Sequence, residues 1–255
     1  MLIAWQNLAD AASVATDSEQ ASLPAANVQH AHVSRKWQTA AGVKSAYLLL
    51  DLGAAQSCAL LALAGTNFTS AATLRLRGSV TDPTATGSLA YDSGSIGAGV
   101  VSGYGAAYHA FTATAARYWR IDVADATVDD NLAVGRVFLG PSWSPGVNMQ
   151  LGWSVRFADM SRRAKSSAGQ VWADVRPKPR VLEFTLDYLT EADMFGNAFA
   201  LALAQGITGD VLAVPDIDGD YLSQQAVYGL LEDNAPVVEP RLGLYSHKFT
   251  IEERL

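Results

Sequence analysis

The sequence predicts an all-β protein, and three features of its pattern support this. Several short segments alternate apolar and polar residues with a period of two, as in a strand with one buried face. Glycine- and proline-rich turns separate these segments. Only one segment has a convincing helical pattern. Many short strands with few helices are typical of sandwiches and barrels.

The first half of the chain contains the first set of expected strands. Residues 47–52 and 59–64 have strand length, and each ends at a glycine, although the leucine and alanine content of the second also permits a helix. Residues 73–80 alternate cleanly, with two leucines on one face and two arginines on the other. Residues 93–107 contain five glycines and are expected to form a long loop.

Strand signals resume after this loop, at residues 116–123 and 134–140. In a strand, Trp119, Ile121 and Val123 share one face. The residues between them are charged or aromatic and face the other way. The bulky side chains are therefore expected to fill a core, while the charged ones face solvent or a neighbouring strand.

Two prolines and a glycine between Pro141 and Gly146 predict a domain boundary. We place the first domain at residues 1–142 and the second at residues 143–255. Trp143, inside this segment, favours a packed linker over a floppy one.

The second half combines strands with the single expected helix. Residues 181–188 alternate, so Leu182, Phe184, Leu186 and Tyr188 are expected to point inward. Thr190 and Asp193 have the spacing of a helix cap, which predicts a helix that ends at Gly206. Phe195, Phe199 and Ala202 share one face of that helix. Further strands are expected at residues 210–215, 226–233 and 245–253.

Composition narrows the classes of function. The net charge is −7 and the isoelectric point is about 5.0, which argues against nucleic acid as a partner. Charged residues make up only 17%, so part of the surface is expected to be covered by a partner. The single cysteine, Cys58, cannot form an internal disulfide, and no zinc-ligand spacing is present.

The N-terminus has no basic leader, and no apolar run reaches the roughly 18 residues that a bilayer span needs. We therefore expect synthesis and folding in a cytoplasm, with no membrane insertion. Such a protein can still leave the cell as part of a particle.

Four segments in order resemble the discoidin-type, galactose-binding-like jelly-roll family. They are "YLLLDLG" (47–53), "LRLRGSVTD" (74–82), "ARYWRIDV" (116–123) and "VGRVFLG" (134–140). The resemblance implies an N-terminal jelly-roll sandwich. It also implies sugar or lipid-headgroup binding through end loops, although a fold alone confers no activity. The disulfide of many members is absent because the chain has one cysteine.

The second half is similar to distal or minor tail proteins of long-tailed bacteriophages. The similarity lies in "AGQVWADVRPKPRVLEFTLDYLTEAD" (168–193) and "YLSQQAVYGLLED" (221–233), followed by a closing strand. It implies a C-terminal β-barrel-like domain with one helix that forms a ring at a tail tip.

No sequence motif marks catalysis. A nucleophile elbow, a metalloprotease helix, a phosphate-binding loop and a dinucleotide fingerprint are all missing. A Ser-His-Asp triad needs only spatial proximity, so that alternative stays open. We nevertheless predict that the protein is not an enzyme and needs no cofactor.

Two groups of residues have side chains that can bind metal ions. His30 and His32 would share a strand face, but no carboxylate or cysteine lies nearby, so a polar loop is the preferred interpretation. Asp216, Asp218 and Asp220 resemble the start of a calcium loop, but the expected glutamate is missing, which favours a turn. No metal is predicted, and calcium at the three aspartates stays open.

Two sets of residues are candidates for binding. A sugar site needs an aromatic platform beside charged or amide groups. Two clusters fit this description, and we predict carbohydrate binding at His32, Arg35, Trp37, Tyr104, Tyr108 and His109. The alternative for Trp37 is that it packs into the core at the end of the barrel. A basic cluster in this acidic chain predicts assembly contacts at Arg162, Arg163, Lys165, Arg176, Lys178 and Arg180, against the alternative of a solvated face.

Together these observations predict a structural component of a phage-like tail tip. It is expected to be made in the host cytoplasm, to reside in the virion and to form a ring with copies of itself. Tail-tube and tail-tip hub proteins are the other expected partners. The jelly roll is expected to decorate the outside and to take part in host-surface attachment through a glycan. The alternative is a carbohydrate-binding module or adhesin that forms no ring.

Overall fold

The structure is a computed structural model that describes residues 1–101 and 104–255. Contacts divide it into two compact units. The sandwich unit consists of Leu2–Trp143 and Val214–Ala226, and the arm unit consists of Met1, Ser144–Ala213 and Val227–Leu255. The division after Trp143 lies one residue from the predicted boundary. The sequence did not predict that Val214–Ala226, which follows most of the arm unit in the chain, belongs to the sandwich unit.

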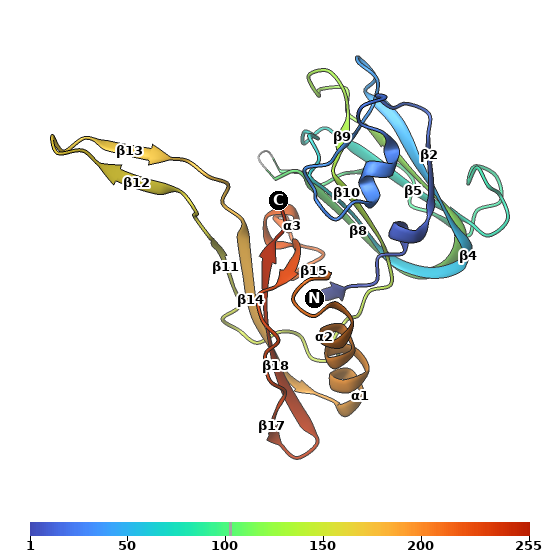
Figure 1. The fold of residues 1–255 in the computed structure, drawn as a ribbon. Helices are drawn as coiled ribbons and strands as arrows, with labels where there is room; N and C mark the ends of the chain where they lie inside the picture. Colours follow the sequence, from blue (N-terminus) through green and yellow to red (C-terminus); the bar gives the residue numbers. More distant parts are fainter. Residues whose placement is uncertain (102–103) are drawn as a thin grey trace. The chain divides into compact units, whose positions relative to one another are not determined.

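The sandwich unit is built from strands and short helical turns (Figure 1). Its strands are β1 (Leu2–Ala4), β2 (Ser13–Thr16), β3 (Trp37–Gln38), β4 (Ser45–Ala64), β5 (Thr73–Ser79), β6 (Tyr91–Asp92), β7 (Ile96–Gly97), β8 (Ala106–Ala124), β9 (Ala133–Val134) and β10 (Arg136–Gly140). Its helical turns are two 3-10 helices (Leu8–Ala11 and Ala25–Gln29) and α3 (Leu222–Gln225).

Two long antiparallel strands, β4 and β8, organise the sandwich unit. The sheet order is β10-β4-β8-β5-β6, with β2 added to β4 and β7 added to β5. The early half of β4 pairs with the late half of β8, against which β5 also pairs. The late half of β4 pairs with the early half of β8 and with β10. The sheet curls, so its two ends enclose a shared core.

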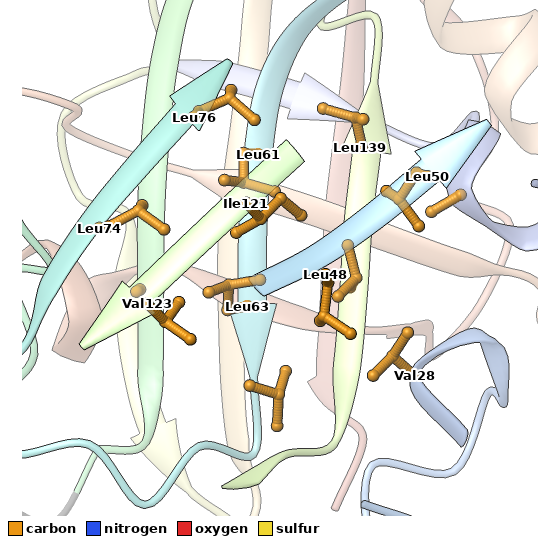
Figure 2. Packing of buried hydrophobic residues seen from close by; sticks show 14 of the residues in the cluster. Val28, Leu48, Leu50, Leu61, Leu63, Leu74, Leu76, Ile121, Val123 and Leu139 are labelled. Carbon is orange, nitrogen blue, oxygen red and sulfur yellow. The ribbon is translucent and has the colours of Figure 1, made fainter. Parts of the chain in front are cut away.

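The core confirms the jelly-roll sandwich predicted for the first half. Figure 2 shows leucines from both halves of β4 packed with side chains from β5, β8 and β10. The labelled members are Val28, Leu48, Leu50, Leu61, Leu63, Leu74, Leu76, Ile121, Val123 and Leu139. Trp119, Ile121 and Val123 of β8 are all buried, as their alternation predicts.

The charged residues between them form ion pairs on the outer face of the sheet. Arg77 and Arg120 both bind the Asp122 carboxylate, at 2.6 and 2.9 Å. The Arg120 guanidinium lies 3.7 Å from the centre of the Tyr47 ring. The bulky side chains and the charged side chains of residues 119–123 therefore lie on opposite faces of β8.

The strand β4 differs from the prediction of two strands that each end at a glycine. Gly53 has φ +76°, and its N–H donates to the Asp51 carboxylate at 2.8 Å. The pairing with β8 shifts register between Asp51 and Gln56. Glycine adopts this positive φ without steric cost, so the chain bends and continues as one strand. The loop expected over residues 93–107 is interrupted by β7 and ends where β8 begins; Ser102 and Gly103 lie outside the described residues.

The arm unit contains an antiparallel, curled sheet and one helical segment. Its strands are β11 (Ser154–Phe157), β12 (Arg162–Lys165), β13 (Val171–Asp174), β14 (Arg180–Leu189), β15 (Asp210–Val214), β16 (Val227–Leu231), β17 (Val238–Arg241) and β18 (Leu244–Glu253). The order is β15-β16-β18-β14-β11, with β17 on β18. The helical segment consists of α1 (Glu191–Asp193), a π-helical turn (Met194–Ala198) and α2 (Phe199–Gln205). This confirms a β-barrel-like unit with one helix.

The predicted alternation in β14 holds for most of the strand and then fails at Tyr188. Leu182, Phe184 and Leu186 are buried, but Tyr188 is 48% exposed. Tyr188 has φ +58°, and the register with β18 shifts between Leu186 and Leu189. The extra residue turns Leu189 inward in place of Tyr188.

The helix begins as predicted, but its predicted face is the solvent-exposed one. Thr190 caps the helix by accepting the N–H of Asp193 at 3.1 Å. Phe195 and Phe199 lie on one face and are each 46% exposed. The buried face consists of Met194, Ala198 and Leu201. Among the described residues, no helix has the length and hydropathy that a transmembrane helix requires.

Candidate functional site

The first predicted sugar-binding cluster is only partly available at the surface. Trp37 is fully buried, and its indole N–H donates to the Ser18 carbonyl at 3.0 Å. A platform must present its ring face, so the assignment of Trp37 to a sugar site is corrected: it is a core residue. His32 and Arg35 are exposed, and the His32 ring stacks on His30 at 5.1 Å.

The second predicted cluster does not converge on one surface. Tyr108 is buried, and its hydroxyl donates to the Ala226 carbonyl at 3.4 Å, so it is not available as a platform. His109 is the next residue of β8 and therefore points to the opposite face. Its Nε2 lies 2.7 Å from the Tyr91 hydroxyl, and burial lowers its pKa. Tyr104 is half-buried in the loop before β8.

His109 instead belongs to an aromatic cluster that the sequence analysis missed. Tyr91, His109 and Phe111 are half-buried and lie beside the fully buried Trp119. The Tyr91 and Phe111 rings are 4.6 Å apart, and the His109 and Phe111 rings are 5.8 Å apart. We refer to these four residues as the aromatic cluster. The i, i+2 spacing of His109 and Phe111 in the sequence shows that they share a strand face. Tyr91 lies on another strand, so its place beside them could not be predicted from this spacing.

Most of the predicted basic cluster lies on a two-stranded extension of the arm unit. Among the described residues, strands β12 and β13 pair only with each other, as a two-stranded sheet that extends away from the larger sheet of the unit (Figure 1). Every residue of both strands is exposed. We refer to residues 159–178 as the arm. It carries exposed apolar side chains as well, with Val171 63%, Trp172 66% and Val175 76% exposed.

Three of the arm's cations have no acidic partner. Within the described residues, no carboxylate pairs with Arg162, Arg163 or Lys165. The other two are held inside the arm: Arg176 pairs with Asp174 at 3.0 Å, and Lys178 pairs with Asp159 at 3.4 Å.

Arg180, the sixth residue of the predicted basic cluster, is corrected. Its side chain is 4% exposed and binds the Glu253 carboxylate. Its Nε and its backbone N–H each donate to Glu253 Oε2 at 3.0 Å. Arg180 thus joins β14 to the end of β18 and is not available to another subunit.

Exposed apolar side chains are concentrated in the arm unit. Among the described residues, every large apolar side chain that is exposed lies in that unit, with the exceptions of Val80 and Tyr221. Large exposed apolar surfaces usually mark interaction sites.

The groups considered as metal ligands do not come together in the part of the chain that the structure describes. No group of three or more histidine, cysteine or acidic side chains there is arranged to hold a metal ion. At the Asp216 segment, the Asp218 N–H donates to the Asp216 carboxylate at 3.2 Å, as in a turn. Cys58 is buried, and burial raises the pKa of its thiol to about 12. That thiol is therefore unsuited to nucleophilic chemistry.

Comparisons with known proteins find similarity in structure only. No family model and no curated protein matches the sequence. Chitosan-binding module 1 of a chitosanase/glucanase from Paenibacillus sp. IK-5 has a TM-score of 0.43 and 19% identity, covering 53% of this chain and 99% of the module. The lectin domain of lectinolysin, solved with the Lewis B antigen, has a TM-score of 0.43 and 15% identity, covering 54% and 98%.

A Streptococcus pneumoniae fucose-binding module has a TM-score of 0.42 and 12% identity, covering 53% of this chain and 95% of the module. Each of these matches covers about half of this chain. The sugars named here are ligands of those proteins.

Proposed function

We propose that the protein is a structural subunit of a phage-like tail tip and that it assembles through its arm unit. The observation that supports this proposal most strongly is the arm, a two-stranded ribbon in which no residue of either strand is buried. Isolated two-stranded hairpins are marginally stable in water, because they bury too little apolar surface. A ribbon that presents Val171, Trp172 and Val175 to solvent is therefore suited to pack against another subunit.

Self-assembly into a ring fits this arrangement. A ring forms when one surface of each subunit contacts a different surface of the next and the rotation closes. In this proposal the protein resides in the virion, contacts the tail tube and the tail-tip hub proteins, and performs no catalysis. The sandwich unit faces outward and is left for contacts with the host surface. The resemblance of the second half to distal and minor tail proteins supports the proposal.

Shortening the arm tests this function. Arg162 and Asp174 are paired across the arm, so an Asn-Gly turn can replace residues 163–173. The wild-type chain is expected to sediment as an oligomer, alone or with its tail partners, and the shortened chain as a monomer. At a concentration too low for the wild type to assemble, the two melting temperatures should differ by less than about 2 °C, because the removed strand residues are exposed. A wild-type chain that is monomeric at every concentration and absent from purified particles would contradict the proposal.

Glycan binding by the sandwich unit is a second candidate, favoured by the aromatic cluster. Tyr91, His109 and Phe111 present partly exposed rings beside a hydrogen-bonding imidazole. Aromatic faces with a few polar groups are the usual components of a sugar site. The fold similarity to carbohydrate-binding modules is compatible with this candidate.

Replacing Phe111 tests glycan binding. If the aromatic cluster stacks on a sugar ring, Phe111→Ala should weaken binding on a glycan array by about tenfold or more, because it removes a stacking face. Tyr221→Ala, which changes an exposed aromatic residue elsewhere in the sandwich unit, is the matched control and should leave binding unchanged. Equal binding by Phe111→Ala and the wild type would count against a sugar site at this cluster.

A further inference from the structure

The exposed face of the helix forms a second apolar surface in the arm unit. Phe195 contacts Phe199 at 5.9 Å and the Tyr245 ring at 5.3 Å between ring centres. Leu203, one turn after Phe199, is 79% exposed. We refer to Phe195, Phe199, Leu203 and Tyr245 as the helix patch. The buried side chains of the helix are on its opposite face, so the fold of the unit does not require Phe199 and Leu203 to be apolar.

Acidic side chains border the helix patch. Burial raises the pKa of the Tyr245 hydroxyl, and the charges of Glu239 and Glu191 raise it further. Glu191 lies four residues before Phe195 on the helical segment, and Glu239 follows Val238, which pairs with Ser246 beside Tyr245. Both carboxylates are exposed. The helix patch is thus an apolar centre with a negative border.

The arm has the complementary character. Directly paired residues of β12 and β13 share a face, which places Arg163 with Ala173 and Lys165 with Val171. The opposite face holds Ala164 with Trp172. From residue 159 to residue 178 the arm carries five cations and two acids, whereas the whole chain has a net charge of −7. The arm is therefore an apolar ribbon with a positive border.

The two surfaces belong to the same unit, but they do not meet within one chain. Every residue of β12 and β13 is exposed, and Phe195, Phe199 and Leu203 are exposed as well. In Figure 1 the arm extends from the end of β14 that lies away from α1 and α2. A contact between the two surfaces must therefore join different copies of the chain.

We propose that the arm of one copy docks on the helix patch of a second copy. This inference rests on the proposed assembly function and names the two surfaces that meet. Val171 and Val175 of the arm cover Phe195, Phe199 and Leu203. Arg163 and Lys165, on the same face as Val171, face Glu191 and Glu239. The contact is heterologous, because each copy uses its arm toward one neighbour and its helix patch toward the other.

Mixing two variants tests the pairing. The arm variant carries Val171→Ser and Val175→Ser, and the patch variant carries Phe199→Ser and Leu203→Ser. Each variant alone should remain monomeric in sedimentation and native mass spectrometry. A mixture should form one-to-one dimers and nothing larger, because only one intact arm and one intact patch can meet. Leu151→Ser, at a 99% exposed site in the same unit, should assemble like the wild type.

Charge reversal gives a second measurement that does not depend on apolar contacts. Glu191→Lys with Glu239→Lys should weaken assembly at least about tenfold and should reduce its salt dependence. Adding Arg163→Glu and Lys165→Glu to the same chain should restore assembly, because the charges are complementary again.

The results separate this inference from the proposed function. If the arm-shortened chain fails to assemble but the patch variant assembles normally, the arm binds elsewhere: the pairing is overturned, and the assembly function stands. If the chain is incorporated only by binding a different tail protein, and the variant mixture yields no dimer, a second copy is not the occupant. A wild-type chain that never assembles overturns both.

Discussion

Replacing Trp119 with alanine is expected to lower the free energy of unfolding of the sandwich unit by about 3–5 kcal/mol. The Trp119 side chain is fully buried between Tyr91, Phe111 and the backbone of Gly78. A Cβ on Gly78 would lie 2.8 Å from the Trp119 ring, so the ring fills the space above that glycine. Alanine would leave a cavity that its neighbours fill only in part, because β5 is paired with β8 along its whole length.

Urea unfolding measures the loss, and hydrogen exchange read by mass spectrometry assigns it to a unit. Exchange should accelerate in β4, β5 and β8 and remain unchanged in β14 and β18. Trp172→Ala removes an exposed tryptophan and should change stability by no more than about 0.5 kcal/mol. A loss below about 1 kcal/mol in Trp119→Ala would show that Trp119 does not support the core in this way.

Replacing Arg180 with alanine is expected to cost the arm unit about 3–5 kcal/mol. The change leaves the Glu253 carboxylate, whose side chain is 19% exposed, without the guanidinium that it binds. An uncompensated charge in a poorly hydrated site is strongly destabilising, whereas the intact pair contributes little beyond what well-packed apolar residues would. The double replacement Arg180→Met with Glu253→Leu should therefore recover most of the loss.

A surface ion pair in the same sheet provides the control. Lys248 and Glu183 lie 2.6 Å apart, and their side chains are 50% and 42% exposed. Lys248→Ala should cost no more than about 1 kcal/mol, because solvent screens an exposed pair. The same urea and exchange measurements apply, with the change now expected in β14 and β18. Equal losses for Arg180→Ala and Lys248→Ala would contradict the difference that burial is expected to make.

Strand periodicity predicted the parts of the fold that depend on one buried face. In β5, Leu74 and Leu76 are buried, with Arg75 and Arg77 facing outward. In β18, His247, Phe249 and Ile251 are buried as their alternation predicts, and Thr250 is buried as well. These positions were predictable because side-chain direction alternates along any strand, whatever its partner.

Backbone departures from periodicity were not predictable. Gly53 bends β4 without ending it, and Tyr188 shifts the register of β14 by a positive φ. A glycine can either end a strand or bend it. At Gly53 the outcome depends on how β4 pairs with β8, which the local sequence does not show. Nothing in the residues around Tyr188 marks a bulge, because the bulge depends on how β14 aligns with β18.

Exposure was the least predictable property of the candidate sites. The arm's cations were identified from sequence, but the partner of Arg180 is Glu253, which comes 73 residues later. Trp37 was predicted as a ligand platform, yet its ring is fully buried. The sequence showed that Phe195, Phe199 and Ala202 share a helix face, but it is a second apolar face that is buried. Which of two apolar faces is covered depends on the whole sheet, not on the helix itself.

The return of Val214–Ala226 to the sandwich unit affects how this protein can be made and remodelled. On the ribosome, the first 143 residues are synthesised before Val214–Ala226, which begins more than seventy residues later. The sandwich unit can therefore complete its folding only after much of the arm unit has been synthesised. Recombination is restricted in the same way. A crossover after Trp143 would replace residues 1–143 with those of another protein. The segment Val214–Ala226, including α3, would then lack the residues that it packs against in this protein. Productive exchange between related genes should therefore transfer both pieces together.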